Sequence, residues 1–479
     1  MEKQNNKVWV GISDRSNDPE LVQMAQQEFV ELPIIDTLSK DDSVELKSNR
    51  RDFLKYLGFG LGAATLASCE TPVRRAIPYV VKPDKIVPGV ATFYASTFVN
   101  GGDFAPVLVK TREGRPIKLD GNKLSSVTKG GTDARAQASV LSLYDTARLR
   151  NPGIVNNDEV KAMTWEELDS AVKGQLNGSS RIRIVTKTLM SPITRQAVAD
   201  FKEKYPNTEI VQYDPVSSSA ILLANEACFG QRVIPSYHFN NADMVVSFGA
   251  DFLGTWISPS EYSCQYTKGR MINLSDPKMS RHIQVEAGMT MTGSNADNRI
   301  MIRPTEQGAA IATLYNALAA KTGAPTVGAP QINEKAAAAL RKVAGDLIDH
   351  RGHALVVSGS NNTGEQILVN KINDLIDSYG STIDFGHVSY QRQGIDRDVR
   401  NLVREMNAGS IDALFVLNAN PAFDLPDAEA FTNGMAKVKL RVSFNQTMDE
   451  TTAQCTHIAP ANHFLESWGD VHPKRGHYG

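Results

Sequence analysis

The sequence predicts an α/β fold with two doubly wound, mainly parallel sheets flanked by helices, and a small N-terminal domain that contains β-strands. Two observations support this prediction. Short apolar segments recur along the body of the chain, and most are followed by small or polar residues and then by a helical pattern. The 479 residues also provide enough chain for two or three domains with a large core, and the 41% hydrophobic content is that of an ordinary globular protein.

The elements are predicted from local patterns. Residues 106–119 read as a hairpin that turns at Glu113 and Gly114, and Thr164 with Glu167 forms a capping box at the start of a helix. Further strands are expected at 182–186, 209–213, 244–248, 271–274, 354–357, 413–417, 439–444 and 457–459, and further helices at 192–204 and 307–321.

Charge and hydropathy exclude several classes of function. The chain carries 51 basic and 53 acidic residues, a net charge of −2, and no basic block, so we predict no nucleic-acid partner. No stretch of about 18 apolar residues occurs, and the body is therefore not expected to cross a membrane.

The N-terminal region contains the most specific signal in the chain. Arg50 and Arg51 precede Phe53, Leu54 and a weakly apolar run, which ends after small residues at Cys69. A twin arginine in this position is typical of export in the folded state. We expect the export machinery to read Arg50, Arg51, Phe53 and Leu54. We expect Cys69 to be acylated and to anchor the chain on the periplasmic side of a bacterial inner membrane. The alternative is a basic helix start followed by a buried helix.

The composition along the chain indicates six parts. Residues 472–479 contain no closing helix or strand, so we expect the last part to be truncated. The parts are 1–47, an extension before the signal that is partly disordered and has a helix expected at 19–31; 48–69, the twin-arginine signal with its lipoprotein cleavage site; 70–90, a proline-rich tether; 91–160, the N-terminal β-containing domain; 161–320, the first α/β domain; and 321–479, the second α/β domain.

Candidate binding residues follow three of the predicted strands. Ligands of doubly wound sheets lie beyond the carboxyl ends of the strands. The loops there contain Gly249 and Asp251, Ser358 and Asn361, and Asn420 and Pro421. The alternative is that these loops only end strands. No phosphate-loop motif and no nucleophile elbow occurs, so we predict no catalytic residue.

The cysteines and histidines do not form a recognisable metal motif. A disulfide between Cys228 and Cys264 is chemically permitted outside the cytoplasm, but unpaired buried thiols are favoured. Four histidines lie near Cys455 with spacings that match no standard zinc site, and we therefore predict no metal ligand. These histidines are His457, His463, His472 and His477.

Several segments in the same order resemble the molybdopterin oxidoreductase superfamily over roughly residues 91–470. They are 114–122, 136–145 with 148–152, 164–167, 248–252, 296–297 with 302–304, 414–416 with 420–421, and Pro460-Ala461 with Phe464-Leu465-Glu466 and Trp468-Gly469-Asp470. The displaced twin-arginine signal is similar to that of the variant-export subgroup, and in particular to the large periplasmic subunits of alternative complex III, the quinol-oxidising respiratory assemblies of bacteria. The resemblance implies three partners: an integral quinone-site membrane subunit, a multihaem cytochrome c, and an iron–sulfur domain.

Departures from the family pattern bear on the cofactors. Residues 97–106 contain no cysteine, and Asp133 stands where the last cluster thiolate of catalytic relatives would lie. A carboxylate does not replace a thiolate in holding an iron–sulfur cluster. Neither Cys228 nor Cys264 lies in a molybdenum-ligand loop.

The resemblance therefore implies a scaffold domain without molybdenum, with iron–sulfur clusters only in a following domain or a partner. If molybdopterin guanine dinucleotide is held, the six strand-end residues named above are its expected contacts. Two alternatives stay open: an active molybdenum–pterin oxidoreductase that acts on a small oxyanion or sulfur compound, and a lipoprotein binding module without a redox role.

Overall fold

The structure is a computed structural model that describes residues 87, 89–156, 159–272, 274–275 and 277–479. These residues belong to one compact unit, residues 83–479. The predicted helix at 19–31, the export residues and Cys69 lie outside the described residues. No helix in the described part of the chain is long and apolar enough to cross a membrane.

A three-stranded antiparallel sheet opens the described chain. Its strands are β1 (Thr92–Asn100), β2 (Asp103–Arg112) and β3 (Arg115–Gly121), in the order β1-β2-β3. The predicted turn is confirmed, because Glu113 and Gly114 both have positive φ between β2 and β3. Helix α5 (Ala134–Leu143) covers one face, where Val140 packs with Phe98 and Leu119.

The first lobe is a seven-stranded sheet with helices on both faces. Its strands, in spatial order, are β5 (Glu159–Ala162), β4 (Gly153–Asn156), β16 (His457–Ile458), β15 (Leu440–Ser443), β14 (Ala413–Leu417), β6 (Ile182–Thr186) and β7 (Thr208–Gln212). The five strands from β16 to β7 are parallel, and β4 and β5 are antiparallel. Helices α6 (Trp165–Gln175) and α7 (Pro192–Lys204) pack on one face, and α14 (Asp396–Asn407) and α16 (Ala428–Met435) pack on the other. The short α15 (Pro421–Asp424) follows β14.

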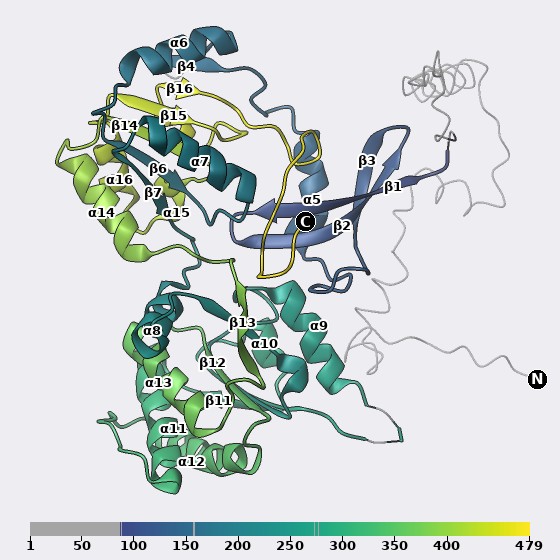
Figure 1. Cartoon of the computed structure of the whole chain (residues 1–479). Helices are drawn as coiled ribbons and strands as arrows, with labels where there is room; N and C mark the ends of the chain where they lie inside the picture. Colours follow the sequence, from purple (N-terminus) through teal and green to yellow (C-terminus); the bar gives the residue numbers. More distant parts are fainter. Residues whose placement is uncertain (1–86, 88, 157–158, 273, 276) are drawn as a thin grey trace, which may run out of the picture. The chain divides into compact units, whose positions relative to one another are not determined.

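The second lobe is a four-stranded parallel sheet. Its strands, in spatial order, are β11 (Asn298–Met301), β10 (Arg281–Glu286), β9 (Met244–Phe248) and β12 (Ala354–Ser358). Helices α11 (Gln307–Thr322), α12 (Glu334–Asp349) and α13 (Thr363–Leu375) lie together on one face (Figure 1). The other face carries α8 (Ser219–Phe229), α9 (Pro259–Arg270) and the antiparallel pair of β8 (Ile234–Tyr237) and β13 (Ile383–Ser389). The short α10 (Met291–Ser294) follows β10.

The sheets do not divide the chain at residue 320. Strand β12 pairs with β9, so the second lobe is built from residues 219–389. Strand β14 returns to pair with β6, more than two hundred residues earlier in the chain. The predicted boundary between 161–320 and 321–479 therefore does not correspond to either sheet. Local patterns reveal where strands occur, but which strands pair depends on long-range packing that the patterns do not contain.

One predicted strand is wrong, and seven strands of the described residues were not predicted: β1, β4, β5, β8, β10, β11 and β13. Residues 271–272 follow the end of α9 as an exposed loop, with Met271 71% exposed. The next strand is β10, whose His282, Gln284 and Glu286 are all buried. Because these alternate residues are polar, β10 lacks the apolar pattern by which strands are recognised. The edge strand β11 was also missed.

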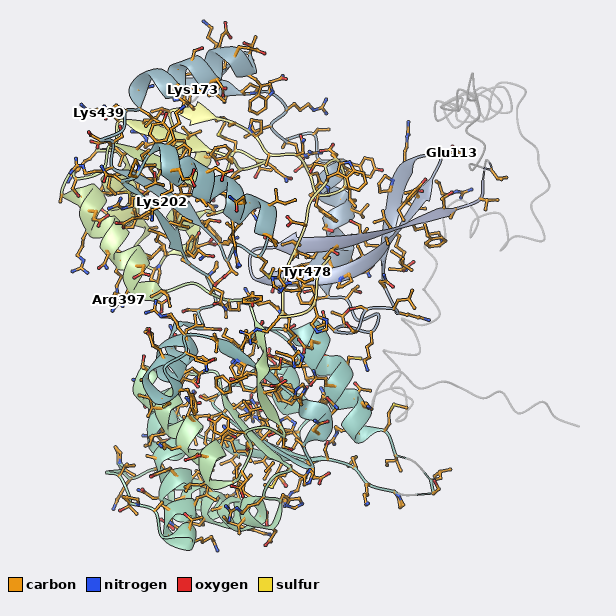
Figure 2. All side chains as sticks on the ribbon, in the orientation of Figure 1. Glu113, Lys173, Lys202, Arg397, Lys439 and Tyr478 are labelled. Atoms are coloured by element: carbon orange, nitrogen blue, oxygen red, sulfur yellow. The ribbon has the colours of Figure 1, made fainter. Side chains whose placement is uncertain are left out.

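The predicted strands at 182–186, 244–248 and 413–417 are confirmed with the same bounds. Apart from the strand at 271–274, the other predicted strands and helices that fall on described residues are confirmed to within three residues. Charged side chains such as those of Lys173 on α6 and Lys202 on α7 lie at the surface (Figure 2).

The predicted capping box of α6 is confirmed and can be tested. Glu167 N donates to Thr164 Oγ1 at 3.2 Å, and Thr164 N donates to Glu167 Oε2 at 2.8 Å. We expect Thr164→Ala to lower the free energy of unfolding by about 1 kcal/mol, because it leaves a backbone N–H of the first turn without its acceptor. Urea unfolding measures the change, and Thr164→Ser, which keeps the hydroxyl, is the control. Equal losses in the two variants would contradict the role of the cap.

Candidate functional site

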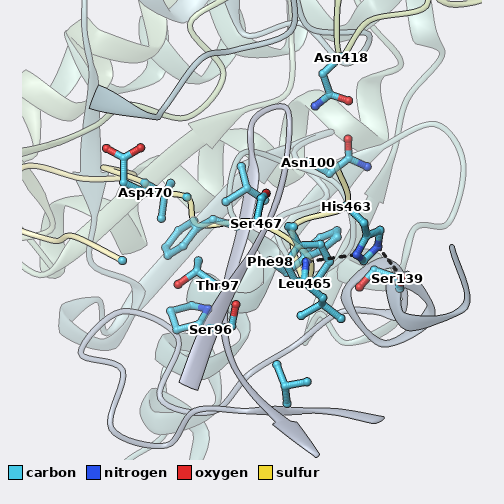
Figure 3. A pocket seen from close by; sticks show the side chains of 18 of the residues that line it. Ser96, Thr97, Phe98, Asn100, Ser139, Asn418, His463, Leu465, Ser467 and Asp470 are labelled. Atoms are coloured by element: carbon cyan, nitrogen blue, oxygen red, sulfur yellow. Dashed lines mark hydrogen bonds between the residues drawn. The ribbon is translucent and has the colours of Figure 1, made fainter. Parts of the chain in front are cut away.

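A cavity of about 1630 Å³ lies at the carboxyl ends of β14 and β15. One wall is β1, whose residues from Tyr94 to Asn100 line it. A second wall comes from residues 417–420, after β14, and residues 444–449, after β15. Residues 461–471 and the C-terminal residues close the remaining side. Asn100 and Asn418 come from different walls and point toward one another (Figure 3).

The lining is rich in amides and hydroxyls. Besides backbone, it presents the side chains of Ser96, Thr97, Asn100, Asn122, Ser125, Ser126, Ser139, Ser142, Asn418, Asn420, Asn445, Gln446, Thr447, Asn462 and Ser467. Asn418 has a φ of 48°, a left-handed conformation that asparagine tolerates better than most residues. The cavity can therefore offer many uncharged hydrogen-bond donors and acceptors.

Three charged side chains of the lining are each paired with another charge. Arg135 Nη1 lies 2.7 Å from Asp103 Oδ2, and Lys187 Nζ lies 3.9 Å from Asp424 Oδ2. Glu466 forms a two-point ion pair with Arg148, with Arg148 Nη1 3.1 Å from Glu466 Oε1. This pairing lowers the pKa of Glu466, and the hydrogen bond from Arg148 is the largest cause.

Asp470 occupies the N-terminus of a helix at this edge of the sheet. Its carboxylate accepts a hydrogen bond from the backbone N of Ile193 at 3.1 Å and another from Ser191 Oγ. The N-terminus of a helix that follows a strand is where phosphates bind in many nucleotide sites. In α7 this position is already filled by a carboxylate from the chain itself.

His463 lies in the cavity wall as a neutral imidazole. Its Nε2 is 3.0 Å from Ser142 Oγ and 3.2 Å from the carbonyl oxygen of Ser139 (Figure 3). The Leu465 backbone N donates to its Nδ1 at 3.3 Å, so Nε2 carries the proton. Burial lowers the pKa of His463.

The other histidines of the C-terminal group have different partners. His457 Nδ1 lies 2.9 Å from Thr456 Oγ1, His477 Nδ1 lies 3.0 Å from Ser126 Oγ, and the His472 ring stacks on Tyr478. No group of three metal-ligating side chains occurs among the residues that the structure describes. Cys228, Cys264 and Cys455 are free thiols.

The structure does not bring the six predicted binding residues together. Asn420 lines the cavity and Pro421 begins α15 beside it, whereas Gly249, Asp251, Ser358 and Asn361 belong to the second lobe and are not part of this lining. The polar side chains among them are engaged in internal bonds. Asn420 Oδ1 accepts from Thr451 N at 3.1 Å, Asp251 Oδ1 accepts from Thr292 N at 3.1 Å, Ser358 Oγ accepts from Ser360 N at 3.1 Å, and Asn361 Nδ2 donates to Asp396 Oδ2 at 2.6 Å.

Most of the cavity residues were not found by sequence reasoning. Strand β1 and residues 444–449 contain no motif of known chemistry, and residues 464–466 and 468–470 were recognised only through the family resemblance. The usable signal was compositional: asparagine recurs at the ends of β14 and β15, where a parallel sheet binds its ligands.

Comparison with known proteins decides the fold family. No family model matches the chain. The chain is 25% identical over 410 residues to the menaquinone reductase, molybdopterin-binding-like subunit, of Nitratidesulfovibrio vulgaris, and this match covers 76% of the chain and 58% of that relative. Its structure matches acetylene hydratase from Pelobacter acetylenicus, a member of the molybdopterin oxidoreductase family, with a TM-score of 0.58 and 11% identity over 75% of this chain and 62% of that one. The chain has the molybdopterin oxidoreductase fold.

The resemblance inferred from the sequence motifs is thereby confirmed. The chain spans 58% of the length of its curated relative. That relative is named as a subunit of a menaquinone reductase, and the motifs resemble subunits of another quinone-linked respiratory assembly, alternative complex III.

The molybdopterin fold implies a pterin cofactor, and the cavity residues can be tested against it. A pterin dinucleotide carries phosphates, which proteins hold with free cations or free helix N-termini. Arg135 and Lys187 are paired with carboxylates, and the N-terminus of α7 is capped by Asp470. None of the described lining residues is a cysteine. The described residues therefore do not fit a phosphate-bearing, metal-ligating group, and we derive no chemical step through it.

A buried polar row outside the cavity makes stability depend on pH. His282 on β10 is fully buried, with Nδ1 3.1 Å from Tyr266 Oη and Nε2 donating to Gln284 Oε1 at 3.2 Å. Burial lowers the pKa of His282 to about 4. An unfolded histidine titrates near pH 6.5, so the unfolded state binds this proton first as the pH falls. Stability from His282 is therefore present above about pH 6.5 and is lost as the pH falls toward 4.

Because His282 protonates less readily in the folded state, we expect it to lower the free energy of unfolding by about 2 kcal/mol when the pH falls from 7 to 5. Urea unfolding at the two pH values measures this difference in the wild type and in His282→Gln, which does not titrate. The variant is expected to lose less stability on acidification, even if it is less stable at pH 7. The same pH dependence in both proteins would contradict the prediction.

Proposed function

We propose that the chain is an exported subunit of a membrane respiratory electron-transfer complex, in which its molybdopterin-type domain serves as a scaffold. The observation that carries this proposal is the similarity, over 76% of the chain, to a menaquinone reductase subunit named molybdopterin-binding-like. The paired charges of the cavity support the scaffold role, because they leave little to hold a phosphate-bearing cofactor. The complex is of the quinol-oxidising, alternative complex III type.

The proposed partners follow from this assignment. An integral membrane subunit carries the quinone site, a multihaem cytochrome c accepts electrons, and an iron–sulfur domain lies in a following segment or a partner. Arg50, Arg51, Phe53 and Leu54 direct export of the folded chain, and Cys69 fixes it to membrane lipid on the periplasmic side.

Purification of the full protein from its own membranes tests the function. We expect a haem-containing cytochrome and a polytopic subunit to copurify, quinol oxidation by the assembly, and neither molybdenum nor a pterin in metal and fluorescence analysis. Isolation of the chain alone from gently solubilised membranes would contradict the proposal.

The export step has its own test. Replacing Arg50 and Arg51 by lysine keeps the charge but removes the twin-arginine signal, and should leave the protein in the cytoplasm. Cys69→Ser should allow export but release the protein from the membrane. Normal export of the double lysine variant would refute the export assignment.

A second candidate is a working molybdenum–pterin oxidoreductase that acts on a small oxyanion or sulfur compound. The size of the cavity and its position at the carboxyl ends of parallel strands favour it. Stoichiometric molybdenum and extractable pterin in the purified protein would establish it in place of the scaffold. A lipoprotein without redox partners is the third alternative, and it predicts that no haem copurifies.

A further inference from the structure

Among the described residues, no strand pairs with the outer edge of β1, which runs along the cavity. Its register with β2 places Thr97 opposite Pro106, which has no N–H to donate. The Pro106 carbonyl accepts from Asn122 N, on the β3 side, so the backbone of Pro106 faces away from β1. Because antiparallel strands alternate between hydrogen-bonded and non-bonded pairs, the N–H and C=O groups of Thr97 point outward from the sheet. By the same alternation, Ala95 and Val99 also point outward.

The outward backbone groups of β1 have no hydrogen-bond partner among the described residues, although Gly479 lies against the side chain of Thr97. No described residue exchanges a hydrogen bond with the outward groups of Ala95, Thr97 or Val99, and all three residues line the cavity. A row of free N–H and C=O groups is the template onto which extended peptides add as a further strand. Strand β1 has nine residues, so at about 3.3 Å per residue this edge is about 30 Å long.

An exposed tryptophan stands at the same cavity. Trp468 is 104% exposed, although it lines the cavity. Two residues before it, Glu466 pairs with Arg148, and two residues after it, Asp470 accepts from the backbone of Ile193. The loop is thus anchored on both sides while the indole is left uncovered. Large aromatic side chains presented in this way are the residues that dominate binding energy at protein interfaces.

The charge of the lining selects the class of ligand. Its amides and hydroxyls suit the uncharged N–H and C=O groups of a polypeptide, whereas its cations are already paired. We propose that the cavity binds an extended, uncharged segment of a partner protein, which adds to β1 as a fourth strand and packs an apolar side chain on Trp468. This goes beyond the proposed function and does not depend on it.

A single extended segment fits better than a second copy of the chain. In another copy, β1 is part of a three-stranded sheet backed by α5, and the cavity of about 1630 Å³ is bounded on its other sides by residues 417–420, 444–449 and 461–471. Two such sheets cannot meet edge to edge inside a concave site.

Selection of a displayed library of random twelve-residue peptides on the full chain tests the proposal. We expect enrichment of uncharged peptides that contain an apolar or aromatic residue. Ala95→Pro removes an outward N–H that donates to no described residue, and should weaken the selected peptides at least tenfold. Ala95→Ser keeps that N–H and should bind as the wild type does. Trp468→Ala, a surface change, should also weaken binding at least tenfold.

Hydrogen exchange of the wild-type chain provides a readout that does not depend on a variant. A saturating selected peptide should slow exchange of the outward amides of Ala95, Thr97 and Val99 at least tenfold. Four results would each overturn the proposal: no enriched peptide, equal binding to Ala95→Pro and wild type, full protection of these amides in the free chain, or binding of guanosine diphosphate that displaces the peptide. The last would instead assign the cavity to a nucleotide-bearing ligand.

Discussion

Replacing Lys474 by methionine is expected to lower the free energy of unfolding by about 3–5 kcal/mol, the range found when one partner of a buried ion pair is removed. Lys474 Nζ lies 2.5 Å from Glu261 Oε1, and the two side chains are 8% and 4% exposed. The substitution leaves a buried carboxylate whose other side-chain partner among the described residues is Gln265 Nε2, at 3.1 Å. Urea unfolding followed by circular dichroism measures the loss.

Two controls separate the buried charge from general damage. The double variant Lys474→Met with Glu261→Leu removes both charges and should recover most of the stability, because a buried ion pair and an apolar pair of similar size are often close in energy. Lys173→Ala breaks an exposed pair with Asp169 and should cost less than about 1 kcal/mol. A loss below 1 kcal/mol for Lys474→Met alone would show that the pair contributes little.

This ion pair joins the C-terminal segment to the second lobe. Lys474 belongs to the C-terminal segment that closes the cavity, and Glu261 lies on α9 in the second lobe. Backbone bonds from Tyr390 to Pro473 and from Arg475 to Val388 attach the same segment to the second lobe. The cavity therefore combines walls from the first lobe with a segment held by the second, and loosening this attachment should also weaken binding in the cavity.

Local patterns were sufficient for nine of the described strands and for helices α6, α7 and α11, but not for the sheets. The capping box at Thr164 and the apolar strands β6, β9 and β14 are visible in the sequence because each depends on residues close together in the chain. The return of β14 to β6 depends on packing between distant segments, so the predicted domain boundary does not match either sheet. Strand β10 was missed because its buried residues are polar and bond to one another.

The candidate site was harder to predict than the fold because it is built mainly from backbone and uncharged side chains. Such residues form no recognisable sequence motif. Strand β1, the strand-end loops and the C-terminal segment come together around one cavity only in the tertiary structure. Asp133 illustrates the reverse case. The sequence identified it as the position of a missing cluster ligand, and the structure shows that it caps α5 by accepting from Ala136 N at 2.7 Å.

Gly359→Ala tests whether the strand-end loops of the second lobe serve packing or ligand binding. Gly359 follows β12, beside the residues that end β9, and its N–H donates to the Phe248 carbonyl at 2.9 Å. A Cβ at this position would lie 2.4 Å from the Gly249 carbonyl oxygen, which is a backbone atom and cannot rotate away. We expect a loss of about 3 kcal/mol, since the ends of β9 and β12 must separate to admit the methyl group.

Gly174→Ala on α6 is the matched control. Apart from the neighbouring backbone of its own helix, no described atom lies within 4 Å of its added Cβ, so the same change should stabilise the protein by about 0.5–1 kcal/mol through helix propensity. Urea unfolding of both variants should therefore give shifts of opposite sign. If these loops exist to let a ligand approach the backbone, Gly359→Ala would instead leave stability unchanged and abolish binding. A stable Gly359→Ala variant would thus indicate that the strand-end loops of the second lobe serve ligand binding. An unstable variant would indicate that Gly359 is needed for the close packing of β9 and β12.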